Sequence, residues 1–266
     1  MIINPYAFGV SYDPDAQAFF TASGLTGATN LTAINNLVVA LKGFGIWTKM
    51  KAIYPMIGGT AALHKWNLKD PRDLNAAFRL VFNGGWTHSS TGALPNGTNG
   101  YADTNCNMST NYSVNTSVHL SYYSRTSGSF LGQDIAVYDG TTFSAIAIRR
   151  SDQSNNTLFA ANETINYISA ADPTGAGLYI SNRTALNVNN GWRNSTKVVT
   201  GTSTAGTRPN FNMFLANINI NGAPNSGLYG KREVAFSSIG DGLTDTEAAN
   251  FYTAVQAYQT TLSRQV

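Results

Sequence analysis

The sequence predicts a mainly β protein, an antiparallel sandwich with an N-terminal helical segment and a C-terminal helix. From residue 78 onward, about ten to twelve short apolar or alternating runs follow one another, with a turn signal roughly every ten residues. Strands and helices do not alternate along the chain, which argues against a parallel sheet. Apolar residues at helical spacing occur instead towards the two ends of the sequence.

The first part of the chain has helical signals. Residues 1–12 are expected to form an extended arm. Asp13 can cap a helix that has Pro14 in its first turn and stops near Gly24. A second helix is predicted from apolar residues on one face, followed by Gly43. These residues are Leu31, Ile34, Leu37, Val38 and Leu41.

The next segment ends the helical part. Residues 45–55 are dense in large apolar side chains and fit either a strand or a short helix, because periodicity cannot decide over this length. Residues 58–77 look irregular. We therefore divide the chain into residues 1–76, an arm and helical segment, and residues 77–266, the sandwich with its closing helix. Two roles are expected for the first segment, which are docking onto a neighbouring subunit and packing on its own sandwich.

Two hairpin turns are predicted within the sandwich. Asp139-Gly140 follows an apolar run and is a strong hairpin dipeptide, and Asn189-Asn190-Gly191 has the composition of a type I′ turn. Residues 143–148 are apolar on both faces, which is typical of a central strand.

The C-terminal residues give the clearest local signal. Residues 232–239 predict a strand, and Gly240-Asp241-Gly242 predicts a turn. Thr244 can cap the helix that follows, and Glu247 completes a capping box. Phe251, Tyr252, Val255, Tyr258 and Leu262 then recur at helical spacing.

Composition excludes several classes of protein. Charged residues make up only 12% of the chain, about half the usual share. The net charge of +3 is not clustered, so no nucleic-acid surface is expected. Cys106 is the only cysteine, so no intrachain disulfide forms, and we expect it to be a buried structural thiol. No apolar run has the length that crosses a bilayer, and the N-terminus lacks the pattern of a signal peptide.

The sequence contains no constellation that indicates a reaction. Of the glutamates, only Glu163 and Glu233 fall near predicted strands, and neither has the acidic neighbour that a glycosidase needs. The three histidines, His64, His88 and His119, lie far apart in the sequence, without zinc-site spacing. We therefore expect no catalytic residues, no metal ligands, no cofactor and no enzymatic activity.

A calcium-binding site is the alternative to the absence of any metal site. The loop residues Asp139, Asn190 and Asp241 could supply oxygen ligands, but Asp and Asn beside Gly are turn formers first.

After catalysis and metal binding, glycan binding is the remaining function to consider. Aromatic side chains at loop ends can stack on sugars, and Asp or Asn can bond the hydroxyls. The candidate carbohydrate-binding residues are Tyr138, Asp139, Asn190 and Trp192. In the alternative interpretation, Trp192 folds back and covers the edge of the sandwich.

Several segments resemble the concanavalin A-like (laminin G-like) jelly roll. They are residues 97–101 with a Gly followed by Tyr101, residues 118–125 with core aromatics, the hairpin in 177–191, and the closing strand and helix start in 232–247. The resemblance covers about residues 78–255. It implies a jelly-roll fold, which in some relatives binds calcium or glycans.

The whole chain is also similar to uncharacterised proteins of tailed bacteriophages, on residues 46–55, 64–71 and 254–266. This resemblance implies a virion structural protein of the capsid or tail fibre, located in the virion. The expected partners are other virion proteins and further copies in a homo-oligomer, with host surface glycans as an additional lectin-like contact; neither nucleic acid nor membrane insertion is expected. The alternative is a virion-borne or secreted glycan-processing enzyme on the same fold.

Overall fold

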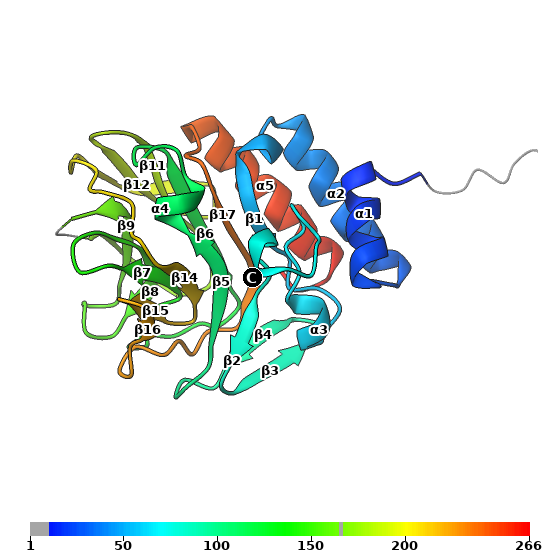
Figure 1. Ribbon diagram of the computed structural model, residues 1–266, viewed down its shortest axis with the longest axis horizontal. Helices are drawn as coiled ribbons and strands as arrows, with labels where there is room; N and C mark the ends of the chain where they lie inside the picture. The colour runs from blue at the N-terminus through cyan, green and yellow to red at the C-terminus, as the bar shows by residue number, and fades with distance from the viewer. Residues whose placement is uncertain (1–10, 165–166) are drawn as a thin grey trace, which may run out of the picture.

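The computed structural model describes residues 11–164 and 167–266. The expected N-terminal arm falls mostly in residues 1–10, outside the described residues. Two sheets pack face to face, and helices cover one of them (Figure 1). The predicted fold class, a mainly β antiparallel sandwich with N-terminal and C-terminal helices, is confirmed.

The first sheet, which we call sheet A, lies under the helices. Its strands in spatial order are β13 (Thr196–Gly201), β12 (Val188–Arg193), β11 (Gly177–Ala185), β6 (Val118–Ser124), β17 (Val234–Gly240), β4 (Gly92–Pro95) and β3 (Trp86–Ser89). In addition, β1 (Met50–Tyr54) pairs with β17. A strand from the N-terminal 76 residues is therefore part of sheet A.

The second sheet, sheet B, forms the other layer. Its strands in spatial order are β10 (Ile168–Ala171), β9 (Asn156–Glu163), β8 (Phe143–Arg150), β7 (Ile135–Tyr138), β14 (Asn212–Leu215), β5 (Tyr101–Asn107) and β2 (Val81–Asn83). A short strand, β15 (Ile218–Ile220), runs parallel to β7 and pairs with β16 (Ala223–Pro224). The predicted hairpin at Asp139-Gly140 is confirmed, because Tyr138 of β7 pairs with Phe143 of β8.

The N-terminal helices begin and end where local chemistry predicts. In α1 (Pro14–Ser23), the side chain of Asp13 accepts a hydrogen bond from the Asp15 N–H, and Gly24 has φ 70°. The second helix, α2, spans Ala28–Gly43. Residues 45–55, for which the sequence left strand and helix open, contain both: a 3₁₀ turn, η1 (Trp47–Lys49), precedes β1. The remaining short helical segments are α3 (Ala61–His64), η2 (Asn75–Ala77) and α4 (Met108–Asn111).

The C-terminal helix α5 (Asp245–Thr261) starts with the predicted capping box. The Thr244 hydroxyl accepts from the Glu247 N–H at 3.2 Å, and the Glu247 carboxylate accepts from the Thr244 N–H at 2.7 Å. These two bonds satisfy N–H groups that an uncapped helix would leave without partners.

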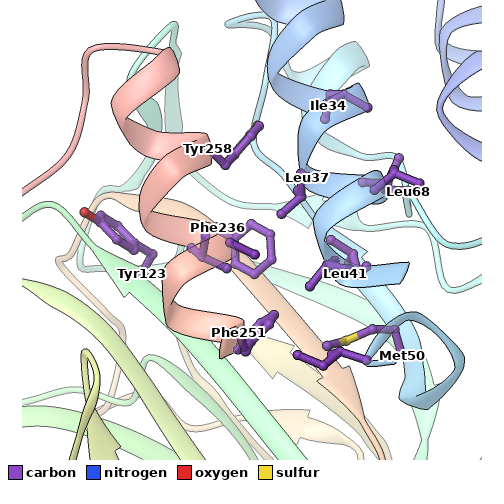
Figure 2. Close-up of a cluster of buried hydrophobic side chains, with 14 of the residues drawn as sticks. Ile34, Leu37, Leu41, Met50, Leu68, Tyr123, Phe236, Phe251 and Tyr258 are labelled. Carbon is purple, nitrogen blue, oxygen red and sulfur yellow. The ribbon is translucent and has the colours of Figure 1, made fainter. Parts of the chain in front are cut away.

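An apolar core joins α2 and α5 to sheet A (Figure 2). Leu37 and Leu41 of α2 lie near Phe251 of α5, and Phe236 of β17 and Tyr123 of β6 close the cluster from the sheet. The N-terminal helices thus pack on their own sandwich, one of the two roles expected for them. Docking onto another virion protein stays a prediction.

A second core fills the space between the sheets. The strands alternate, so that Ile135, Ile146 and Phe159 of sheet B point inward towards Tyr122 and Tyr179 of sheet A. Cys106 is fully buried in this core, and burial raises the pKa of its thiol to about 12. The expectation of a buried structural thiol is confirmed.

No helix among the described residues is long and apolar enough to cross a bilayer. The larger helices all lie on the far side of sheet A, so the outer face of sheet B has none of them over it (Figure 1). That face carries the candidate site.

Candidate functional site

The outer face of sheet B has a floor of small residues between larger apolar walls. Because strand residues alternate, Ala136, Ala145 and Ala160 point outward on three neighbouring strands. Larger side chains surround them, namely Tyr138, Phe143, Tyr167, Ile218, Ile220 and Leu228. Small side chains below tall ones leave a depression in the surface.

We call this depression the outer groove. Its main part has a volume of about 440 Å³, and a second hollow of about 290 Å³ shares Arg150 and Tyr167 with it. The main part is lined by Gln133, Tyr138, Phe143, Arg150, Thr164, Tyr167, Ile218, Ile220 and Leu228. The second hollow adds Gln153, Leu158 and Ser169. Both volumes fall near the range of small-molecule sites.

Three aromatic rings form one wall of the outer groove. The rings of Phe143 and Tyr167 are 4.6 Å apart between centroids, and the rings of Tyr138 and Phe143 are 6.2 Å apart. The Tyr138 hydroxyl donates to the carbonyl of Gly140 at 2.7 Å, which fixes this ring over the β7–β8 turn. The wall is therefore built before any ligand arrives.

Polar groups stand beside this wall. Gln133 is 1% exposed, and its Nε2 donates to the Tyr167 hydroxyl at 3.3 Å. Its Oε1 has no hydrogen-bond partner among the described residues. Burial raises the pKa of the Tyr167 hydroxyl, which keeps it neutral and able to donate. A buried acceptor without a partner is costly, and a ligand hydroxyl can satisfy it.

Arg150 forms the other polar part of the outer groove. Its Nε and Nη2 donate to the two oxygens of Asp152 at 2.8 and 2.6 Å. This paired contact fixes the plane of the guanidinium and leaves Nη1 available to a ligand.

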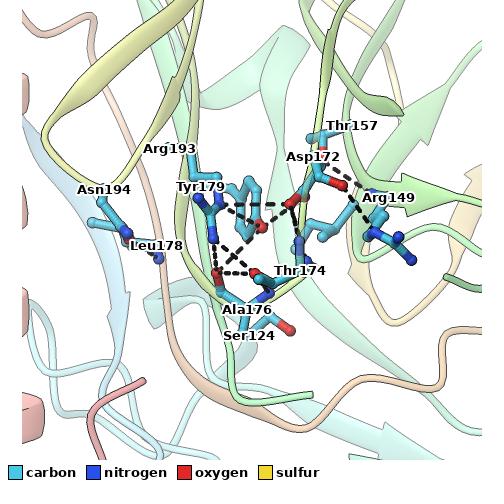
Figure 3. A network of polar contacts seen from close by, with 12 residues as sticks. Ser124, Arg149, Thr157, Asp172, Thr174, Ala176, Leu178, Tyr179, Arg193 and Asn194 are labelled. Atoms are coloured by element: carbon cyan, nitrogen blue, oxygen red, sulfur yellow. Dashed lines mark hydrogen bonds and ion pairs between the residues drawn. The ribbon is translucent and has the colours of Figure 1, made fainter. Parts of the chain in front are cut away.

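The edge of the outer groove is tied to sheet A through Asp172, which follows β10 (Figure 3). Its carboxylate accepts from the hydroxyls of Thr157 and Tyr179, both at 2.7 Å. Burial alone raises the pKa of Asp172, but the hydrogen bonds outweigh burial and the pKa is lowered. Because Tyr179 belongs to β11 and Thr157 to β9, the charged carboxylate holds the β9–β10 hairpin in place.

Asp134 is the carboxylate nearest in sequence to the groove residue Gln133, but it faces the interior. It is 3% exposed, accepts from the Ile148 N–H at 2.7 Å and lies 3.7 Å from Arg232. Burial raises its pKa to about 6, and Arg232 opposes this effect. Among the described residues that line the outer groove, none is an Asp or Glu.

The four predicted carbohydrate-binding residues do not come together. Tyr138 lines the outer groove, and Asp139 occupies the turn next to it, where it accepts from the N–H groups of Thr141 and Thr142. Asn190 and Trp192 are each 4% exposed and lie in β12 of sheet A. Trp192 belongs to the core under the helices, so its side chain packs there and does not stand at a loop end.

The predicted turn at Asn189-Asn190-Gly191 is wrong. These residues lie within β12, and the hairpin closes earlier, where Ala185 pairs with Val188. Gly191 is needed for packing, because a Cβ there would lie 2.4 Å from the ring of Phe159. Glycine is therefore required at position 191 for close packing against Phe159 of sheet B, and not for a turn.

The calcium ligands considered from the sequence do not fit a single site. Asn190 is buried in β12, whereas Asp139 is in the β7–β8 turn and Asp241 follows β17. Within residues 11–164 and 167–266, no three His, Cys, Asp or Glu side chains converge on a common point.

One pattern in the sequence is related to the outer groove. Residues 143–148 are apolar on both faces, and the outward half of this run is the groove floor and wall. Gln133, Tyr167 and Leu228 come from connecting segments, where periodicity gives no indication of direction.

Comparisons with known proteins add a general likeness. No family model matches the chain, and no curated protein matches it. Among solved structures, domain 4 of a GH43 extracellular arabinanase from Geobacillus stearothermophilus, in complex with arabinotriose, matches with a TM-score of 0.47 and 14% identity. It covers 76% of this chain and 98% of that one.

Two sialidases also match. A mutant Trypanosoma rangeli sialidase with trans-sialidase activity has a TM-score of 0.46 and 10% identity over 86% of this chain. A sialidase from Streptococcus pneumoniae has a TM-score of 0.35 and 12% identity over 51% of this chain. The matches span 39% and 24% of those two sialidases. At these scores and identities, the likeness transfers no activity, substrate or residue to this chain.

The comparisons nevertheless correct one expectation. The sequence predicted a protein that is not an enzyme, and these structures are arabinanase and sialidase chains or domains of them. The prediction of a non-enzyme is therefore withdrawn. None of the three is named as a virion protein, so the assignment to a phage particle stays a prediction.

Proposed function

We propose that this protein binds an oligosaccharide in the outer groove. The observation that carries the proposal is the aromatic wall of Phe143 and Tyr167 beside the unpartnered Oε1 of Gln133. A sugar ring has an apolar C–H face that packs on an aromatic ring, and hydroxyls that donate and accept hydrogen bonds. The two sides of the groove match these two sides of a sugar.

The groove also has the extent that an oligosaccharide requires. The two hollows meet at Arg150 and Tyr167, so a ligand can continue from the aromatic wall towards Gln153 and Ser169. The Nη1 donors of Arg150 lie at this junction and suit hydroxyl oxygens.

A glycan array followed by titration calorimetry tests this proposal. In the variant Tyr167→Ala, we expect the affinity for the best array ligand to fall roughly 10-fold, because the stacking ring is lost. The variant Tyr167→Phe keeps the ring and removes only the hydroxyl, so its loss should be smaller. Phe44→Ala is the matched control, because Phe44 is an aromatic side chain that is 38% exposed at the end of α2. Equal affinities for Tyr167→Ala and wild type contradict the proposal.

Glycan processing is a second candidate function, and one observation favours it. The pKa of Asp134, about 6, is in the range of a general acid, and Asp134 directly follows the groove residue Gln133. Its carboxylate points to Arg232, however, so the geometry favours binding. Release of reducing ends from the bound oligosaccharide, and its loss in Asp134→Asn, is the measurement that supports processing.

The virion location and the virion partners are proposals that rest on the sequence resemblance alone. Cryo-electron microscopy of purified phage particles tests them. Density for this chain, with its helices against other virion proteins, supports the assignment, and absence of the chain from the particle contradicts it.

A further inference from the structure

A separate hollow lies at the end of the sandwich that carries α4. Its volume is about 500 Å³, and we call it the α4 hollow. Its polar lining consists of Ser109, Ser113, Asn115, Thr116, Thr207 and Arg208. Hydroxyl and amide groups thus surround a single guanidinium, and among the described residues that line the hollow none is acidic.

Arg208 is available for a ligand. It is half-buried, and no carboxylate or carbonyl among residues 11–164 and 167–266 accepts a hydrogen bond or ion pair from its guanidinium. The carboxylate of Asp139 is distant in the sequence but lies near Arg208 in space, because it accepts from the Asn210 N–H at 3.2 Å. Asp139 is occupied by turn N–H groups and forms no ion pair with Arg208. By contrast, Arg125 and Arg150 are each paired with a carboxylate.

The α4 hollow and the outer groove are neighbours. Gly206 separates them: its carbonyl accepts from Asn115 of the α4 hollow at 2.7 Å. A Cβ on Gly206 would lie 2.6 Å from the methyl of Thr164, which lines the outer groove. The hydroxyl of Thr207 is also 2.9 Å from that of Thr142, directly before the groove residue Phe143. The backbone of residues 206–207 thus contacts lining residues of both depressions.

We propose that the ligand is an acidic saccharide, whose carboxylate or sulfate group binds Arg208 in the α4 hollow while its sugar rings lie in the outer groove. The proposal rests on the proposed function and adds the chemical class of the ligand. A guanidinium presents a planar pair of N–H donors that matches a carboxylate or sulfate, and the surrounding hydroxyls can donate to the remaining oxygens. No described acidic residue lines the hollow itself, and the nearby Asp139 carboxylate is bound by the N–H groups of Thr141, Thr142 and Asn210.

The test compares acidic oligosaccharides with neutral ones of the same backbone. Binding of wild type, Arg208→Gln and Lys231→Gln is measured by calorimetry against oligogalacturonate, its methyl ester, and sulfated and unsulfated forms of one further oligosaccharide. Lys231→Gln is the matched control, because Lys231 is exposed, makes no ion pair among the described residues, and lies beside Gly97. Inorganic sulfate alone is titrated as well, to distinguish a free anion from a saccharide.

We expect wild type to bind at least one acidic saccharide about 10-fold more tightly than its neutral form, as for a hydrogen bond to a charged group. Arg208→Gln should abolish this difference and leave the affinity for the neutral form unchanged, and Lys231→Gln should retain it. Equal binding of acidic and neutral forms to wild type overturns the inference and leaves the groove proposal standing. Binding of sulfate without any acidic saccharide also overturns it. If wild type binds no saccharide of either kind here or on the array, both proposals fail.

Discussion

The Nδ1 atom of His64 lies 2.9 Å from the Nδ1 atom of His88. One ring must therefore donate the proton that the other accepts, and the two cannot both be protonated without breaking this bond. The contact joins α3 to the edge strand β3 of sheet A. His64 and His88 lie far apart in the sequence, and the fold brings their side chains together.

The histidine pair predicts an acid-sensitive fold. His64 is fully buried, and burial lowers its pKa to about 3, with smaller contributions from His88 and Arg264. The unfolded chain binds a proton near pH 6.5, whereas the folded chain does not, so the free energy of unfolding falls as the pH falls below 6.5. From this residue alone we expect a loss of at most about 3 kcal/mol between pH 6.5 and 4.

Urea denaturation of wild type and His64→Gln at several pH values checks this prediction. Glutamine stays neutral, so the curve of unfolding free energy against pH should be flatter for the variant below pH 6.5. His119, whose pKa burial lowers to about 4, is present in both proteins and provides the common background. Parallel curves for the two proteins would show that His64 does not cause the acid sensitivity.

A buried ion pair joins the two sheets near the β11–β12 hairpin. The carboxylate of Glu163 in β9 accepts from Arg183 of β11 and Asn189 of β12. Arg183 is fully buried and also donates to the carbonyls of Ala161 and Leu186. Glu163→Gln leaves a buried guanidinium without its counter-charge, and we expect a loss of about 3–5 kcal/mol in the free energy of unfolding.

The exposed pair of Asp70 and Arg72 is the matched control for Glu163. Their side chains are 33% and 63% exposed, so Asp70→Asn should change the free energy of unfolding by less than about 1 kcal/mol. Denaturant titrations of both variants give the comparison. Similar small losses in the two variants contradict the assigned role of the Glu163–Arg183 pair.

The capping box of α5 predicts a graded effect at Thr244. In Thr244→Ala the hydroxyl that accepts from the Glu247 N–H is lost, and we expect a decrease of about 1 kcal/mol in the free energy of unfolding. Thr244→Ser keeps that hydroxyl and should lie close to wild type. Thermal and denaturant unfolding of the two variants measure the difference, and equal destabilisation by Ala and Ser would assign it to packing of the methyl group instead.

The features that the sequence predicted correctly depend on neighbours within a few residues. The Asp13 cap, the Asp139-Gly140 hairpin and the Thr244–Glu247 capping box are all local, so their chemistry can be recognised in the sequence. Gly191 and the His64–His88 pair depend on residues far along the chain, which local patterns do not contain.

The candidate site was predictable only in part, for the same reason. Tyr138 stands at a recognisable hairpin, and it does line the outer groove. Gln133 and Tyr167 come from separate connecting segments and meet through a 3.3 Å contact between side chains. Trp192 has the composition of a sugar-stacking residue, but its strand directs it into the core below the helices.

The central claim, that the outer groove holds an oligosaccharide, is tested most directly by a crystal structure of the protein with the tightest ligand from the array. We predict a sugar ring stacked on the wall formed by Phe143 and Tyr167, with a hydroxyl within hydrogen-bonding distance of Gln133 Oε1. An ordered saccharide bound elsewhere on the protein, with only water in the outer groove, would contradict the account.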